Sequence, residues 1–131
     1  MSFDTSIMAT KYCFLLATIA FTAYTQLVTK WQLVLHGDVP AGWINQLQYY
    51  IVFLRNPWII SCFLAVLLMA FSWVMTLSEM PLNYAYPVYL SSVLVIISVS
   101  SFFLFGESLP YYRLVGIGVI ICGLVIGFGR Q

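Results

Sequence analysis

The sequence predicts an all-α integral membrane protein with four transmembrane helices. Of its 131 residues, 63% are hydrophobic and only 7% are charged, and five Lys and Arg against four Asp and Glu leave a net charge of +1. A soluble domain usually carries about 25% charged residues, so this chain cannot cover itself with a water-facing surface. The composition therefore excludes an ordinary soluble enzyme, a nucleic-acid-binding protein with a basic surface, and a disordered segment.

Length sets the number of spans. A transmembrane helix needs about 20 apolar residues, so a chain of 131 residues holds four spans and not six. We expect them at about residues 11–35, 57–77, 84–105 and 111–128, within a single domain over residues 1–131. The runs lack the alternating pattern of a β-barrel strand, which leaves the helix as the membrane-crossing element.

The first span is the most polar. Threonines recur along it at steps of four, three and four residues, which places their hydroxyls on one helical face. They are Thr18, Thr22, Thr25 and Thr29, called the threonine stripe below. Gln26 and Lys30 lie on its flank. Polar groups are costly in hydrocarbon unless they bond within the protein or line a wet cavity, so the stripe indicates either threonines bonded to their own helix or a substrate-facing surface.

The connection between the first and second spans, residues 37–56, is not polar. It carries apolar residues at helical spacing: Trp43, Ile44, Leu47, Ile51 and Leu54. This pattern predicts an amphipathic helix in the headgroup region, and the alternative is an extension of the second span into water. Pro57, which follows Asn56 at a favourable first helical position, favours a break and hence the interfacial helix.

The third span opens with tyrosines, among them Tyr86 and Tyr89. Tyrosines at this depth commonly form an interfacial belt, and they also supply flat faces and hydroxyl groups for a sugar. Both interpretations stay open at this point.

The fourth span carries Gly116, Gly123 and Gly127 on nearly the same face. Small residues let helix backbones approach closely, within one bundle or between two subunits. Because four thin helices enclose little space for a substrate, we favour a dimer contact.

The few charges fall near the ends of the spans. With an even number of spans, Lys30, Arg55 and Arg113 share one side of the membrane, and Lys11 and Arg130 share the other, a bias too small to fix the orientation. Lys30 is expected either to reach the headgroups or to hold a lipid phosphate at the mouth of the bundle, with Arg113 as a second cation.

The acids lie away from the span centres. Glu79 follows the second span and Glu107 lies in the turn before the fourth. Proton-coupled export generally needs a buried acid, so this placement argues against it.

Several segments together resemble the small four-helix members of the drug/metabolite transporter superfamily. Residues 81–89, Pro-Leu-Asn-Tyr-Ala-Tyr-Pro-Val-Tyr, resemble the P-x-x-x-A-Y-P start of the third helix, and residues 105–109, Phe-Gly-Glu-Ser-Leu, its F-G-E-x-L turn. Residues 56–58 look like the start of its second helix, and residues 115–125 fit the glycine pattern of its last helix. The resemblance covers about residues 12–130.

Two branches of the superfamily are similar. The small multidrug resistance exporters work as dimers with an essential glutamate in helix one, and alignment on Lys30 puts Thr22 at that position. The subunits of the 4-amino-4-deoxy-L-arabinose-phosphoundecaprenol flippase have the A-Y-P start and lack that glutamate. This second resemblance implies translocation of a polyprenyl (undecaprenyl) phosphate-linked sugar across the bacterial inner membrane, for modification of cell-envelope glycan or lipid A.

The resulting hypothesis is a flippase subunit without catalytic residues, cofactor or metal site. Its expected partners are the polyprenyl phosphate-sugar, membrane lipids, and a second copy or a similar small subunit, with no nucleic acid. The expected substrate-binding residues are Thr18, Thr22, Gln26, Lys30, Tyr86, Tyr89, Arg113 and Glu79. The alternatives are a multidrug-type exporter of cationic small molecules, with Glu79 or Glu107 as coupling acid, and an assembly subunit that transports nothing.

Overall fold

The computed structural model describes the backbone of residues 2–129 and the side chains of residues 6–129, so Arg130 lies outside the described residues. Over this part of the chain, all regular structure is helical and no strand forms. The helices are α1 (Ser2–His36), α2 (Trp43–Leu54), α3 (Pro57–Glu79), α4 (Leu82–Phe105) and α5 (Tyr111–Phe128). Of these, α1, α3, α4 and α5 are long and apolar enough to cross a membrane. The predicted fold class is confirmed.

The segment between the first two spans forms a separate helix. Gly42 precedes α2 with a φ of 97°, a conformation that glycine adopts readily. The helix ends at Leu54, and α3 starts with Pro57 at its first position, so α2 is not a continuation of α3. The side-chain oxygen of Asn56 accepts a hydrogen bond from the Trp58 N–H at 3.0 Å and caps α3. That α2 lies in the headgroup region stays a prediction.

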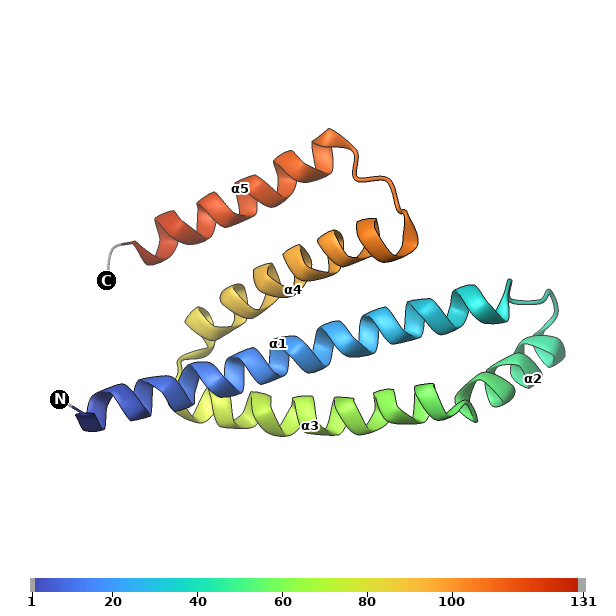
Figure 1. The fold of residues 1–131 in the computed structure, drawn as a ribbon, viewed down its shortest axis with the longest axis horizontal. Helices are drawn as coiled ribbons and strands as arrows, with labels where there is room; N and C mark the ends of the chain where they lie inside the picture. The colour runs from blue at the N-terminus through green and yellow to red at the C-terminus, as the bar shows by residue number, and fades with distance from the viewer. Residues whose placement is uncertain (1, 130–131) are drawn as a thin grey trace.

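Helix α1 lies at the centre of the arrangement. It packs against α3 on one side and against α4 on another, and α5 packs on α4 farthest from α1 (Figure 1). The buried cluster lies near the α3–α4 turn and holds Leu15, Ile19, Met80, Ala85 and Val93. Toward the carboxyl end of α1 a cavity lies between α1 and α3, bordered by both buried and exposed side chains.

Helix α5 packs only loosely on the rest of the chain. None of its described residues is buried, and its ring contact with the rest of the chain joins Phe128 to Tyr84 of α4 at 4.9 Å between centroids. The helix therefore presents most of its surface to whatever surrounds the protein.

Candidate functional site

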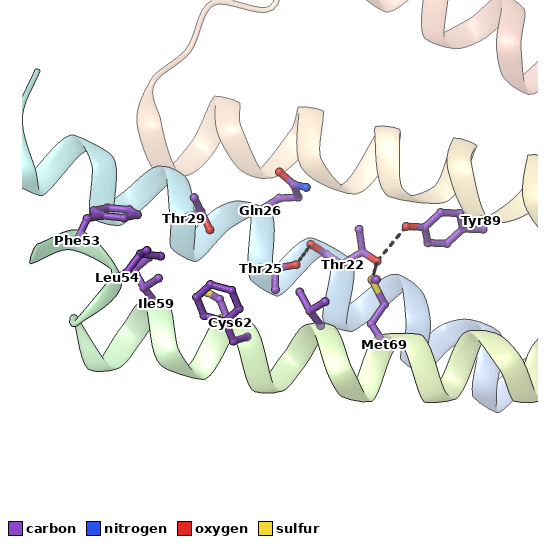
Figure 2. A pocket seen from close by; sticks show the side chains of 12 residues that line it. Thr22, Thr25, Gln26, Thr29, Phe53, Leu54, Ile59, Cys62, Met69 and Tyr89 are labelled. Atoms are coloured by element: carbon purple, nitrogen blue, oxygen red, sulfur yellow. Dashed lines mark hydrogen bonds between the residues drawn. The ribbon is translucent and has the colours of Figure 1, made fainter. Parts of the chain in front are cut away.

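A cavity of about 490 Å³ lies between α1 and α3 (Figure 2). Phe53 and Leu54 of α2 close one end, and Tyr89 of α4 lies at the other. Four polar residues line it from α1, namely Thr22, Thr25, Gln26 and Thr29. Ile59, Cys62, Phe63, Val66 and Met69 of α3 form the opposite wall. Among the described residues that line this α1–α3 cavity, none carries a formal charge.

Thr22 connects three helices at one end of the cavity. Its Oγ1 lies 2.8 Å from the Thr18 carbonyl oxygen, 3.1 Å from the Tyr89 hydroxyl and 3.0 Å from the Met69 sulfur. A threonine hydroxyl donates a single hydrogen and accepts through two lone pairs. When Thr22 donates to the Thr18 carbonyl, Tyr89 donates to Thr22, and the two hydroxyls join α1 to α4.

An aromatic cluster holds Tyr89 in place. The ring centroid of Trp73 lies 5.2 Å from that of Tyr89, and the ring of Tyr86 lies 6.3 Å from both. Tyr86 is half exposed and does not line the cavity. It therefore contacts the expected site only through Tyr89.

The threonine stripe divides between the cavity and the core. Thr18 is only 2% exposed, donates to the Phe14 carbonyl at 2.9 Å, and lies outside the cavity lining. Thr25 lines the cavity, and its hydroxyl bonds to carbonyl groups of its own helix, at 2.9 Å for Phe21 and 2.8 Å for Thr22. Figure 2 shows the Gln26 amide directed toward α4. Thr22, Gln26 and Tyr89 are thus brought together, and Thr18 and Tyr86 lie behind them.

Lys30 forms an ion pair that sequence reasoning missed. Its Nζ lies 3.1 Å from Oε1 of Glu107, and both side chains are about half exposed, at 49% and 44%. Glu107 reaches this position because Gly106 ends α4 in the left-handed region, with a φ of 62°. The pair joins the carboxyl half of α1 to the α4–α5 link.

The other expected charges lie apart from the cavity. Arg113 is exposed in the first turn of α5, and it makes no ion pair with the part of the chain that the structure describes. The start of α5 lies toward the same end of the molecule as the α2–α3 junction (Figure 1). Glu79 is the last residue of α3, which ends toward the opposite end of the molecule (Figure 1), and its Oε2 is 3.8 Å from Nζ of Lys11.

Two polar residues outside the predicted site fix the end of the cavity. Gln32 is only 2% exposed, and its Oε1 accepts a hydrogen bond from Nδ2 of Asn56 at 2.7 Å. Phe53 is 8% exposed, stacks on Tyr49 and makes a T-shaped ring contact with His36. Gln32 follows Thr29 by three residues and so continues the helical spacing of the threonine stripe, although the predicted stripe ends at Thr29. The sequence indicates Asn56 as the residue before Pro57 at the start of a helix, but it gives no sign of the hydrogen bond to Gln32.

The glycines of α5 make no close helix contact within the chain. A Cβ atom built at Gly116, Gly123 or Gly127 meets no atom of the described structure within 4 Å. Gly123 borders an apolar groove against α4. Their role in a dimer contact stays a prediction.

The chain is similar to one protein family and to two named proteins. The family model described as Small Multidrug Resistance protein matches residues 29–120, more than half of the chain. Two relatives carry the name "Probable 4-amino-4-deoxy-L-arabinose-phosphoundecaprenol flippase subunit ArnE". The protein of Aeromonas hydrophila is 37% identical over 73 residues, 56% of this chain and 63% of the relative, and that of Aeromonas salmonicida is 34% identical with the same shares.

The chain thus spans less than two thirds of the length of these curated relatives. No solved structure matches it. The helices able to cross a membrane, together with these relatives, identify a multi-pass protein of the inner membrane. The resemblance to small four-helix transporters is confirmed, and the chain belongs to the Small Multidrug Resistance protein family.

Proposed function

We propose that the chain is a flippase subunit that translocates a polyprenyl (undecaprenyl) phosphate-linked sugar across the bacterial inner membrane, for modification of cell-envelope glycan or lipid A. The observation that carries this proposal is the chemistry of the α1–α3 cavity: hydroxyl and amide groups along α1, an apolar wall along α3, and no charged side chain among the described lining residues. A sugar ring likewise combines polar and apolar surface, since it has hydroxyl groups on its rim and C–H groups on its faces. Its hydroxyl groups can therefore bond to α1 while its faces pack on α3.

In this proposal the sugar exchanges hydrogen bonds with the cavity wall. Thr22 and Tyr89 bond to each other at 3.1 Å, and a sugar hydroxyl inserted between them replaces that bond without leaving a donor or acceptor unpaired. Gln26 offers two donors and an acceptor at the edge of the cavity. Thr18 and Tyr86 hold Thr22 and Tyr89 in place, and neither contacts the sugar.

The phosphate belongs at Lys30. Lys30 follows Gln26 by one helical turn on the same face of α1, so a group attached to the sugar reaches it at the mouth of the cavity. Arg113 is a second cation toward that end of the molecule. Translocation makes and breaks no covalent bond, so we expect neither catalytic residues nor a cofactor.

The names of the relatives support the class of substrate, because both carry the name "Probable 4-amino-4-deoxy-L-arabinose-phosphoundecaprenol flippase subunit ArnE". The same names, with the exposed surface of α5, lead us to propose that the chain pairs with a second copy or with a similar small subunit. The glycine face of α5 is the proposed contact.

The proposal is tested in reconstituted vesicles with a labelled polyprenyl phosphate-sugar. The label should change leaflet faster than in protein-free vesicles, and Gln26→Ala should slow it, because the cavity loses its amide. Gln48→Ala is the matched control, since Gln48 is an exposed glutamine of α2 outside the cavity. Exchange no faster than in protein-free vesicles, with the chain alone and with a similar small subunit added, would overturn the proposal.

Export of cationic small molecules is the second candidate, and the family match favours it. In that case Glu79 or Glu107 has to couple transport to protons, but both are ion-paired and lie outside the α1–α3 cavity. Addition of a cationic drug to vesicles carrying a pH gradient distinguishes the two. We expect no drug-dependent proton movement, and its observation would favour the exporter.

A further inference from the structure

A second cavity borders the carboxyl half of α1. It is a groove of about 360 Å³ between α1 and the end of α4, lined by Leu27, Val28, Trp31, Leu104 and Phe105. Four of the side chains are purely hydrocarbon, and the fifth, Trp31, adds a single indole N–H. We call it the α1–α4 groove. It follows the same turns of α1 as Gln26 and Thr29 of the α1–α3 cavity, so a polar site and an apolar site border the same stretch of helix.

The Lys30–Glu107 ion pair lies where the two walls of this groove end. Lys30 stands between Val28 and Trp31 in α1, and Glu107 follows Phe105 across Gly106. The 3.1 Å separation of their charged atoms therefore ties one wall to the other. Half-exposed ion pairs contribute little to stability, so another anion can replace the carboxylate at small cost.

Three kinds of group meet around this stretch of α1: hydroxyl and amide groups on the side of the α1–α3 cavity, an apolar groove on the side of α4, and the Lys30 cation. A polyprenyl phosphate-sugar carries the matching groups, with its phosphate between the sugar and the hydrocarbon chain. The cation gives the complementary charge for the phosphate, and the groove offers only C–H surface apart from the indole N–H of Trp31.

We propose that the α1–α4 groove is the subsite for the first part of the polyprenyl chain, and that the lipid phosphate displaces Glu107 from Lys30 when the chain enters. This inference rests on the proposed function. In the empty protein Glu107 occupies the phosphate position and holds the α4–α5 link against α1. Displacement of the carboxylate frees the link and opens the groove along its length.

The groove is tested by filling it. Leu104 is 67% exposed, so Leu104→Trp has room to fold and places a larger side chain in the groove. The matched control is Leu64→Trp, at a leucine that is 59% exposed. Leu64 lines an apolar groove of about 350 Å³ between α1 and α3, on the side that carries Tyr24 and Ser61.

The measurement is binding in detergent micelles, by native mass spectrometry, of undecaprenyl phosphate, of dimethylallyl phosphate, and of phosphatidic acid. Leu104→Trp should weaken undecaprenyl phosphate binding roughly tenfold, as expected for the loss of about two buried CH₂ groups. It should leave dimethylallyl phosphate binding unchanged, and Leu64→Trp should change neither.

The displacement of Glu107 is tested separately with the short ligand. Glu107→Gln removes the competing carboxylate, so dimethylallyl phosphate should bind several-fold more tightly, and Lys30→Gln should abolish its binding. Tighter binding in Glu107→Gln supports the exchange of anions. Weaker or unchanged binding would overturn it.

Three further results of the binding measurement separate this inference from the proposed function. If the wild type binds undecaprenyl phosphate and Leu104→Trp binds it equally well, the groove is not the chain subsite, while the proposed function stands. If phosphatidic acid binds as tightly as undecaprenyl phosphate, the groove takes acyl chains in general and the polyprenyl assignment is overturned. If the wild type binds no undecaprenyl phosphate, both this inference and the proposed function fail.

Discussion

Thr22 is the residue at which α1, α3 and α4 meet. In the exporters that the chain resembles, the aligned position carries a glutamate whose charge depends on pH. The threonine hydroxyl instead stays neutral and bonds to Tyr89 at 3.1 Å and approaches Met69 at 3.0 Å. A neutral donor and acceptor at this position suits a ligand that exchanges hydrogen bonds with it, such as a sugar hydroxyl.

The Thr22–Tyr89 hydrogen bond should contribute measurably to the free energy of unfolding. Thr22→Val and Tyr89→Phe should each lower the free energy of unfolding by about 1 kcal/mol, because a buried hydrogen bond is lost. The double variant should lose little more than either single one, with a coupling of at least about 0.5 kcal/mol. Denaturant titration in detergent micelles measures these values. Thr25→Val is the control, since Thr25 bonds only within its own helix; additive losses would show that the two hydroxyls do not interact.

Asn56 has two separate roles at the start of α3. Its oxygen caps the helix and its nitrogen donates to Gln32. Asn56→Ala should destabilise the protein by about 1–2 kcal/mol, and Asn56→Asp should recover part of the loss, because the carboxylate still caps the helix. Thermal unfolding in detergent compares the three proteins. Equal instability of the Asp and Ala variants would mean that the cap contributes nothing.

At the scale of elements, α2 has the most distinctive environment. Trp43 is 77% exposed, and Ile44, Leu47 and Ile51 are each at least half exposed, while Phe53 is the buried residue of the helix. An exposed apolar face of this kind is stable when it lies in the headgroup and acyl boundary. Phe53 belongs to α2 and closes one end of the α1–α3 cavity. A shift of α2 would therefore open or close that end.

The interfacial position of α2 is checked through Trp43. In a variant with Trp31, Trp58 and Trp73 replaced by Phe, we expect fluorescence of Trp43 to be quenched most strongly by lipids brominated near the headgroup. A Trp58-only variant is the control for a helix that starts a span. Strong quenching of Trp43 by lipids brominated near the chain ends would place α2 in the hydrocarbon core instead.

The sequence predicts the helices more completely than it predicts the residues of the site. Hydrophobic runs, Pro57 and the helical spacing after Trp43 are local signals, and they predicted the all-α class and the separate helix α2. The stripe also identified one wall of the cavity. The opposite wall was not predictable, because Cys62 and Met69 look like any other apolar residues of a span. The Lys30–Glu107 pair joins segments far apart in the sequence, and no local spacing brings them together.

For the whole molecule, the open question is what covers α5. A second subunit is the proposed answer, and it predicts that Gly123→Leu weakens dimer formation, since a bulky side chain prevents close helix approach. A Cβ atom at position 123 meets no atom within 4 Å, and the groove of about 270 Å³ that Gly123 borders against α4 leaves room for a longer side chain, so the monomer should still fold. Light scattering in detergent measures the oligomeric state. Gly118→Leu is the matched control, because Gly118 is equally free of neighbours but lies on another face; equal loss in both variants would reject the glycine face as the contact.

The uncharged lining of the α1–α3 cavity has an electrical consequence. Moving one elementary charge across a membrane costs or yields about 2.3 kcal/mol per 100 mV. The described lining of the cavity carries no formal charge, and Lys30, one turn beyond Gln26, is paired with Glu107, so movement of these groups transfers almost no net charge. A rearrangement of the empty cavity and of this ion pair should therefore proceed at the same rate in energised and de-energised membranes, whereas the loaded protein, which carries the charge of its lipid phosphate, should respond to voltage.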